Sequence, residues 1–124
     1  MRIHGIAFAA LVLSFALNAF AAGSVDGEWE ADMPAREGTT PATLKLKVKE
    51  KGKLTGSITT SRGESEIQGG KVEGDQVSFK QILRPGNREV TIIYTGTVDG
   101  DEIQFKRELP EFGVERDFTA KRKK

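Results

Sequence analysis

Apolar and polar side chains alternate through most of this chain, and no stretch has the period of an amphipathic helix. In the segment 42–51, for example, leucine and valine alternate with lysine. A period of two places successive side chains on opposite faces of an extended strand. Glycine-containing turns separate the alternating segments, and Asp99-Gly100 is the pair most typical of a two-residue hairpin. The pattern therefore predicts an all-β chain.

Eight short segments carry this alternation, and tight turns join most of them. We expect strands over 27–33, 42–51, 54–60, 64–68, 76–83, 88–98, 101–108 and 114–122. Consecutive hairpins form a meander, and a meander of eight strands can close into a barrel without exposed edges. The prediction is a single antiparallel up-and-down β-barrel. The alternative is a β-sandwich, whose Greek-key connections need longer links.

Several glycines are expected to shape the barrel. Ile67 and Val72 are an odd number of residues apart, so a β-bulge at the Gly-Gly pair 69–70 would return both side chains to the inner face. Gly56 and Gly96 also fall on inward positions of the alternation. We interpret them as bends that help the sheet to close, with room for a ligand as the alternative.

The first residues have the features of a secretory signal peptide. Arg2 supplies a positive charge, an uncharged apolar run follows over 6–17, and Ala-Phe-Ala at 19–21 matches the small-x-small cleavage pattern. The apolar run is shorter than the roughly 18–20 residues that span a bilayer, which disfavours a transmembrane anchor. We therefore expect a signal peptide over 1–21 and one domain over 22–124. The mature protein is expected in the periplasm or outside the cell, with no stable membrane insertion.

The composition excludes several classes of function. The chain has 19 Lys and Arg against 18 Asp and Glu, so it lacks the excess positive charge of a general nucleic-acid binder. It has no Cys, and its single His, His4, lies in the expected signal peptide. The mature chain would then lack the usual zinc ligands and the imidazole of catalytic triads. We expect no nucleic-acid partner, no metal, no cofactor and no catalytic residue.

Residues at both ends of the domain carry a resemblance to a known family. Gly27-Glu28-Trp29 opens the first expected strand, and Arg122 lies on the inward face of the last one. In this respect the chain resembles the lipocalin (calycin) family, in which a Gly-x-Trp packs at the closed end of the barrel and a basic residue of the last strand lies across the Trp. The resemblance implies that Gly27, Trp29 and Arg122 form a structural plug, with the guanidinium stacked on the indole ring.

Short turn motifs extend a second likeness over nearly the whole domain. Leu-x-Gly occurs at 54–56, Val-x-Gly-Asp at 72–75 and Gly-Thr-Val-Asp-Gly-Asp at 96–101. In these motifs the sequence is similar to small secreted bacterial β-barrel proteins, which implies a lipocalin-like barrel and brings no activity with it. The avidin family shares the barrel and some of these features. Its biotin site uses several tryptophans, however, and this chain has one.

Polar residues replace apolar ones on the inner face at the end of the barrel opposite the Trp. The order of the hairpins places Thr60, Gln81, Arg107 and Arg116 there, with Tyr94 on the same face. An isolated charge inside a barrel is costly unless it is paired or hydrated. Two inward arginines therefore predict a water-filled mouth that holds an anionic or carboxylate-bearing small molecule, with further hydrogen bonds from Gln81 and Tyr94.

Structural alternatives remain open for these arginines. A bulge would turn one of them outward, or Glu108, Glu111 or Glu115 would neutralise both at the rim. If the site forms, apolar walls are expected to hold the rest of an amphipathic ligand. These walls would consist of Ile58, Phe79, Ile92, Tyr94 and Phe105.

Together these features favour a non-enzymatic binder of a small amphipathic or anionic molecule at the barrel mouth. The acidic residues fall mostly on outward positions or in turns, so no pair of carboxylates is placed for acid–base catalysis. The main alternative is an envelope-associated structural or protein-interaction module without a ligand, and a small barrel enzyme comes third. The expected partner is a small molecule, and the protein is expected to be a monomer or a weak oligomer.

Overall fold

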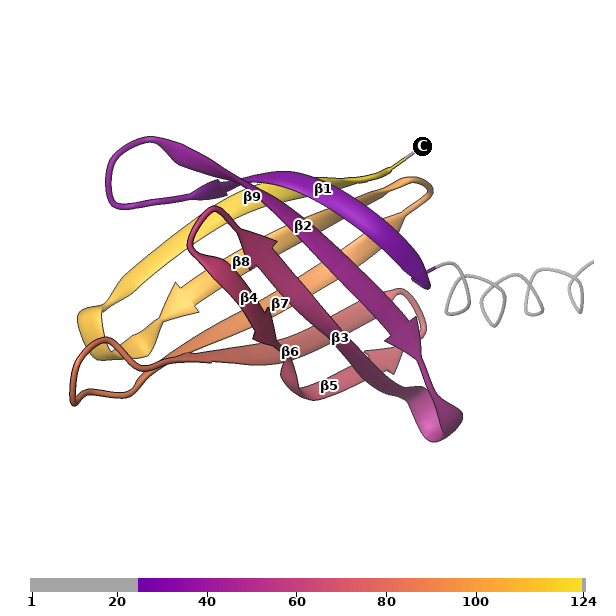
Figure 1. Cartoon of the computed structure of the whole chain (residues 1–124). Coiled ribbons are helices and arrows are strands. Elements are labelled where there is room, and N and C mark those ends of the chain that lie inside the picture. The colour runs from indigo at the N-terminus through magenta and orange to yellow at the C-terminus, as the bar shows by residue number, and fades with distance from the viewer. Residues whose placement is uncertain (1–24, 124) are drawn as a thin grey trace, which may run out of the picture.

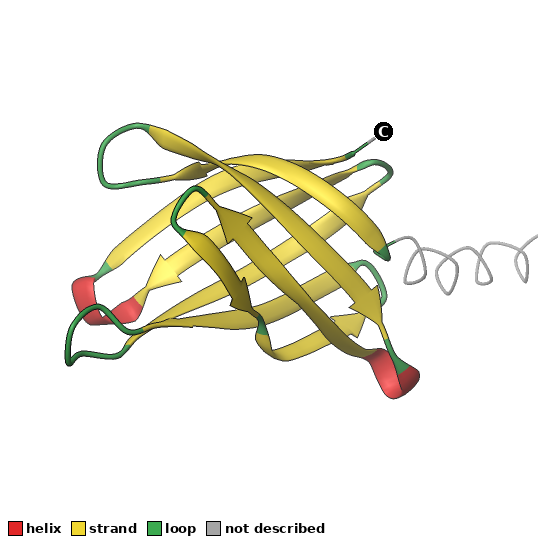
Figure 2. Ribbon diagram, viewed as in Figure 1, coloured by secondary structure: helices red, strands yellow, loops and turns green. Residues whose placement is uncertain are grey.

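The computed structural model describes residues 25–123, which fold into an all-β barrel (Figures 1 and 2). The expected signal peptide, 1–21, lies outside the described residues. Two short 3-10 helices, η1 (Glu50–Gly52) and η2 (Pro110–Phe112), lie in the connections after β2 and β8. The strands are β1 (Gly27–Pro34), β2 (Thr39–Val48), β3 (Lys53–Thr60), β4 (Gly63–Glu66), β5 (Gln68–Glu73), β6 (Gln76–Leu83), β7 (Val90–Asp99), β8 (Glu102–Leu109) and β9 (Val114–Arg122).

Eight of the nine strands in this part of the chain form one closed antiparallel ring. Around the ring the order is β1, β2, β3, β5, β6, β7, β8 and β9, and β9 pairs with β1 to close it. The remaining strand, β4, pairs with β3 next to β5. The predicted antiparallel barrel is therefore confirmed, and the chain does not form the alternative sandwich.

The fourth predicted strand differs from expectation. The structure divides this part of the chain at Ile67 into β4 and β5, which both pair with β3. The pairing of β5 with β6 shifts register between Gln68 and Lys71, so the bulge predicted at 69–70 is present. Ile67 and Val72 are both buried, as a bulge between them requires.

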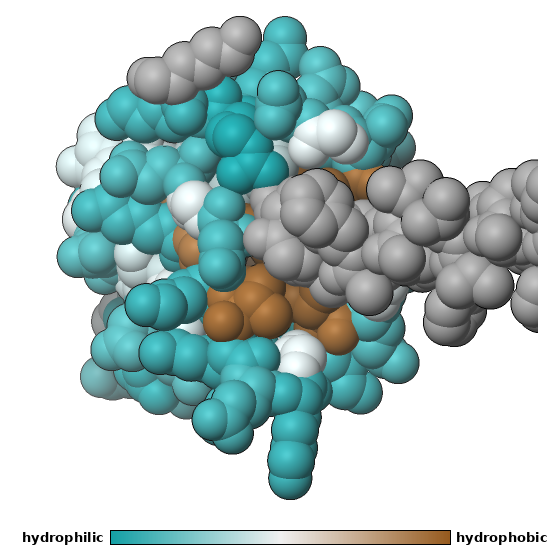
Figure 3. All heavy atoms as spheres, turned by 90° about the vertical axis from the view of Figure 1, so that its right-hand side faces the viewer, coloured by the Kyte–Doolittle hydropathy of each residue, from teal (hydrophilic) through white to brown (hydrophobic). Residues whose placement is uncertain are grey.

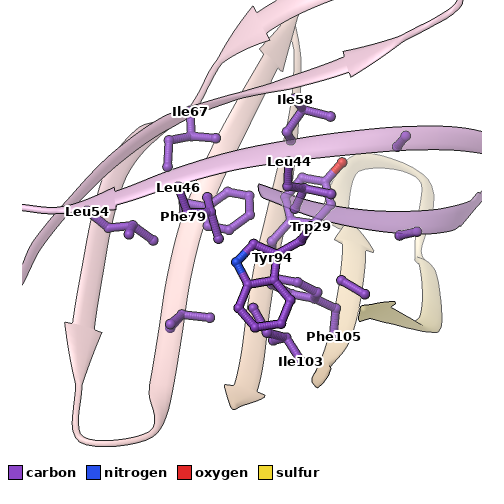
Figure 4. Packing of buried hydrophobic residues seen from close by; sticks show 14 of the residues in the cluster. Trp29, Leu44, Leu46, Leu54, Ile58, Ile67, Phe79, Tyr94, Ile103 and Phe105 are labelled. Carbon is purple, nitrogen blue, oxygen red and sulfur yellow. The ribbon is translucent and has the colours of Figure 1, made fainter. Parts of the chain in front are cut away.

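Aromatic side chains pack against one another across the middle of the barrel. The rings of Phe79 and Tyr94 stack with their centroids 4.9 Å apart, and those of Phe105 and Phe118 stack at 5.1 Å. Edge contacts join the two stacks, among them one of 5.8 Å between Phe79 and Phe105 (Figure 4). Such stacked and edge-on pairs are the favoured arrangements of aromatic rings. The aromatic cluster closes the interior between the two ends.

Two inward glycines allow close approach and leave no space for a ligand. A Cβ atom added to Gly96 would lie 2.8 Å from both Ile103 and the ring of Phe105, so these side chains already occupy its space. A Cβ atom added to Gly56 would lie 1.9 Å from the carbonyl oxygen of Lys45 on the neighbouring strand. Gly56 also has a φ of +154°, which L side chains rarely adopt. The alternative that these glycines make room for a ligand is therefore wrong.

Trp29 lies at the end of the barrel that carries the β5–β6 and β7–β8 turns, on the right in Figure 1. The Arg122 guanidinium carbon lies 4.3 Å from the centre of the indole ring. Its Nε donates to Asp101 Oδ1 at 3.0 Å and its Nη1 donates to the carbonyl oxygen of Asp26 at 2.9 Å. The indole Nε1–H donates to the carbonyl oxygen of Val25 at 3.0 Å. The sequence pattern did not indicate the roles of Val25 and Asp26, because they precede the alternating segment.

Gly27 leaves room for this arrangement. A Cβ atom added there would lie 3.1 Å from Arg122 Nη1, and its φ is +130°. The plug residues thus meet through one guanidinium that covers the indole ring and approaches the backbone of β1. Seen from this end, most of the surface is hydrophilic, with an apolar area near the middle (Figure 3).

Candidate functional site

A cavity of about 640 Å³ lies at the opposite end, on the left in Figure 1, where the β1–β2 loop and the β3–β4 turn meet. We call this cavity the mouth cavity. Its lining comes from both the loops and the inner face of the barrel. The inner-face residues are Met33, Ile58, Thr60, Gln81, Leu83 and Arg107. The loops and adjacent strand ends contribute Arg36, Glu37, Arg62 and Glu64, among others.

A chain of hydrogen bonds lies between the aromatic cluster and this cavity. Arg107 Nε donates to the Tyr94 hydroxyl oxygen at 3.2 Å, and the Tyr94 hydroxyl donates to Gln81 Oε1 at 2.7 Å. Tyr94 and Arg107 are direct partners in the register of β7 and β8, and Gln81 lies diagonally across β6 and β7. Side chains of direct and diagonal cross-strand neighbours are within reach of one another. The register of three strands therefore builds the chain of hydrogen bonds.

The direction of these bonds leaves Gln81 and Arg107 with free N–H donors. The amide oxygen of Gln81 accepts from Tyr94, which turns its Nε2 group away from the hydroxyl. Within residues 25–123, neither Gln81 Nε2 nor the terminal nitrogens of Arg107 have a hydrogen-bond partner. No side-chain nitrogen or oxygen of the described residues is both fully buried and unbonded, so these donors reach accessible space. Because Gln81 and Arg107 both line the mouth cavity, we infer that their free N–H groups face it.

The charge of Arg107 is not neutralised by a carboxylate. Two of the three acids considered for this role pair with other bases: Glu115 with Lys106 at 3.5 Å and Glu111 with Arg88 at 3.8 Å. The third, Glu108, forms no ion pair with Arg107. Across the described residues, no carboxylate oxygen lies within 4.0 Å of the Arg107 side-chain nitrogens. A half-buried guanidinium without a counter-charge attracts an anion. The alternative in which an acid at the rim neutralises both arginines therefore does not hold for Arg107.

Arg116 lies apart from this arrangement. It is the register partner of Arg107 on β9, yet it is exposed and does not line the mouth cavity. The structure therefore does not bring the two predicted arginines together around one cavity. Thr60 does line the cavity, and its hydroxyl oxygen accepts from the backbone N–H of Arg62 at 3.2 Å.

Tyr94 is held in its neutral form. Burial raises the pKa of its hydroxyl, and the charge and hydrogen bond of Arg107 lower that pKa by less. The phenol therefore keeps its proton at neutral pH and donates it to Gln81. This fixes the orientation of the Gln81 amide and, through it, the donors that face the cavity.

The apolar walls expected around a ligand are mostly absent. Ile58 lines the cavity, whereas Phe79, Ile92 and Phe105 do not line it and are fully buried in the core. Sequence alternation identifies the inner face, but it cannot tell which inward side chains pack against one another and which face a cavity. The cavity lining is instead rich in hydroxyl groups and charges from the loops. Those loop residues could have been found only from the order of the hairpins, which puts 35–38 and 61–62 at the same end.

A second hollow, of about 470 Å³, lies on the outer face of β6 to β9. Its polar side chains pair with one another: Gln76 Nε2 donates to Thr97 at 3.1 Å, and Thr119 donates to Gln104 at 2.8 Å. Lys106, which also lines this hollow, pairs with Glu115. The mouth cavity is therefore the better candidate for a binding site.

Comparison with known proteins assigns this barrel to no family. No family model, curated protein or solved structure matches the chain. Residues 25–123 contain no group of three or more Asp, Glu, His or Cys side chains arranged to hold a metal ion. In the same part of the chain, no helix is long and apolar enough to cross a membrane.

Proposed function

We propose that this barrel is a non-enzymatic binding protein that holds a small anionic molecule in its mouth cavity. The observation that carries the proposal is the donor-only floor, formed by the free N–H groups of Gln81 and Arg107. A carboxylate accepts two parallel hydrogen bonds from one guanidinium, a geometry that lysine does not reproduce. The tyrosine behind these donors fixes them before the ligand arrives, which reduces the entropic cost of binding.

The ligand's anionic group would lie at the floor and its remainder toward the loops. The interior beyond the floor is filled by aromatic rings, so an apolar tail has no channel to enter. Hydroxyl groups of Thr39, Thr40, Ser61 and Ser65 line the outer part of the cavity. We therefore infer that the ligand is anionic and largely hydrophilic, instead of amphipathic.

Arg107→Gln is expected to weaken binding of a carboxylate by about tenfold to a hundredfold, since a hydrogen bond to a charged group contributes about 1.5–3 kcal/mol. Arg116→Gln is the matched control, because it removes the same charge from the register partner that does not line the cavity. Calorimetric titration with a panel of short monocarboxylates and their neutral amides measures the difference. Added salt should weaken binding to the wild type.

Two results would contradict the proposal. Carboxylates would bind the wild type and Arg107→Gln equally, or Arg116→Gln would lose as much affinity as Arg107→Gln. If no carboxylate binds the folded wild type, the structural or protein-interaction role becomes the better account of the barrel.

We further propose that residues 1–21 direct export of the protein and are then removed. The apolar run and the Ala-Phe-Ala sequence at 19–21 support this step. The intact mass of the protein recovered from the periplasm or the medium should equal that of the chain that begins at Ala22. An exported protein that retains its N-terminus, or a protein that stays in the cytoplasm, would contradict it.

A further inference from the structure

The wall of the barrel is open beside the mouth cavity. β4 pairs with β3 alone, and the pairing of β6 with β5 ends at Lys80 and Gln68. From that point toward the mouth, β4 and the end of β6 diverge (Figure 1). The two strands therefore present facing edges that are not hydrogen-bonded to each other. We call the space between them the wall slot.

The register shows which backbone groups face the wall slot on β4. The N–H of Ile67 donates to the carbonyl oxygen of Gly56 at 3.0 Å, so these residues occupy a hydrogen-bonded position of the β3–β4 register. Hydrogen-bonded and non-hydrogen-bonded positions alternate along an antiparallel pair. Glu64 and Glu66 therefore turn their N–H and C=O groups away from β3 and toward the wall slot.

The same reasoning applies to β6. The N–H of Val98 donates to the carbonyl oxygen of Asp75 at 2.8 Å, in the register that continues along β6 and β7. The odd-numbered residues of β6 thus bond to β7, and the even-numbered ones face the other side. Ile82 is the even-numbered residue beyond the last pair with β5, so its N–H and C=O face the wall slot. Within residues 25–123, no strand pairs with β6 at Ile82 on this side.

The free edge of β6 at Ile82 and the donor-only floor belong to one site. Gln81 and Leu83, the neighbours of Ile82, both line the mouth cavity, as does Glu64 across the wall slot. Leu83 is 36% exposed, which leaves an apolar side chain available next to the free edge. An unpaired strand edge is a template for an added strand. A ligand that satisfies both features needs an extended backbone and a terminal anion.

We propose, building on the anion-binding function above, that the ligand is the C-terminal segment of an extended peptide. Its backbone adds to β6 at Ile82, and its terminal carboxylate accepts hydrogen bonds from Gln81 and Arg107. β6 runs toward the mouth, so a peptide that enters from the mouth with its carboxylate foremost runs antiparallel to β6. Antiparallel addition uses the two free groups of Ile82 as one hydrogen-bonded pair.

The experiment titrates the protein with an acetylated Thr-Val-Thr-Val peptide that carries a free C-terminal carboxylate. The comparison ligands are the same peptide as its C-terminal amide, and propionate as a carboxylate without a peptide backbone. The free-acid peptide should bind at least about tenfold more tightly than either comparison ligand. The backbone amide of Ile82 should show a saturable NMR shift with the peptide and none with propionate.

Variants of protein and ligand test the backbone contact. Ile82→Pro removes an N–H that bonds to no neighbouring strand, and proline is tolerated at such edges. It should lose the advantage of the peptide over propionate, while Ile82→Thr, which keeps the N–H, should retain it. Peptides N-methylated at each backbone nitrogen in turn provide the same test on the unchanged protein. Methylation at one position should reduce affinity by about tenfold or more.

The outcomes separate this inference from the function on which it rests. If propionate binds through Arg107 and the peptide gains nothing, the anion site stands and the peptide inference is wrong. If all N-methylated peptides bind like the parent, the backbone contact with β6 is likewise refuted. If neither propionate nor the free-acid peptide binds, both proposals are wrong.

Discussion

Trp29→Ala is expected to lower the free energy of unfolding by about 3–5 kcal/mol, the usual cost of removing a large buried aromatic side chain. Trp29 is fully buried, and its Nε1–H bonds to the carbonyl oxygen of Val25. The substitution leaves a large cavity in a small core, and Arg122 loses the ring that it covers. Chemical denaturation, followed by circular dichroism because the chain has no other Trp, measures the change.

Arg122→Ala provides the comparison for this prediction. It removes the contact with the indole ring but leaves the volume of Trp29 in place, so it should cost much less than Trp29→Ala. If Trp29→Ala unfolds at nearly the same denaturant concentration as the wild type, the packing described for this end is wrong.

Gly56→Ala is expected to destabilise the barrel by about 2–6 kcal/mol, combining about 1–3 kcal/mol of backbone strain with about 1–3 kcal/mol of overpacking. The added methyl group would lie 1.9 Å from the carbonyl oxygen of Lys45, and φ is +154°. The obstacle is backbone, so relief requires β2 and β3 to move apart. Loss of their pairing would open the ring of strands.

Gly86→Ala is the matched control for Gly56→Ala. Gly86 also has a positive φ, +65°, but nothing lies within 4 Å of an added methyl group. It should therefore show the cost of backbone strain alone. Equal losses of stability in the two variants, measured by urea denaturation, would show that the close approach of β2 and β3 contributes nothing.

The alternation of side chains predicted the strands and the closed barrel because both depend on local patterns. A period of two identifies the inner face, and tight turns force neighbouring strands to pair. The bulge at 69–70 was also predictable, since one extra residue is the simplest way to keep both Ile67 and Val72 inside the barrel. The identity of the inward polar residues Gln81 and Arg107 came from the same pattern.

The depth of each inward residue and the completeness of the wall were not predictable in this way. The alternation of side chains shows which face of a strand a residue lies on, but it does not show how far along the barrel the packed core extends. Arg116 was therefore expected inside the barrel, whereas it lies exposed. The division of one predicted strand at Ile67 accompanies a change of partners, because β4 pairs with β3 alone whereas β5 pairs with both β3 and β6. The orientation of the Gln81 amide likewise depends on Tyr94 and Arg107, which come from two other strands.

An NMR titration with acetate tests the donor-only floor most directly, because it observes the N–H groups that are proposed to bind the anion. The side-chain NH₂ signals of Gln81 and the Nε–H signal of Arg107 should shift in a saturable manner with one shared dissociation constant. The Nε–H signal of Arg116 should stay unchanged, since that side chain does not line the cavity. Saturable shifts at Arg116 with none at Gln81 and Arg107, or no saturable shift at any of the three, would contradict an anion site at the barrel mouth.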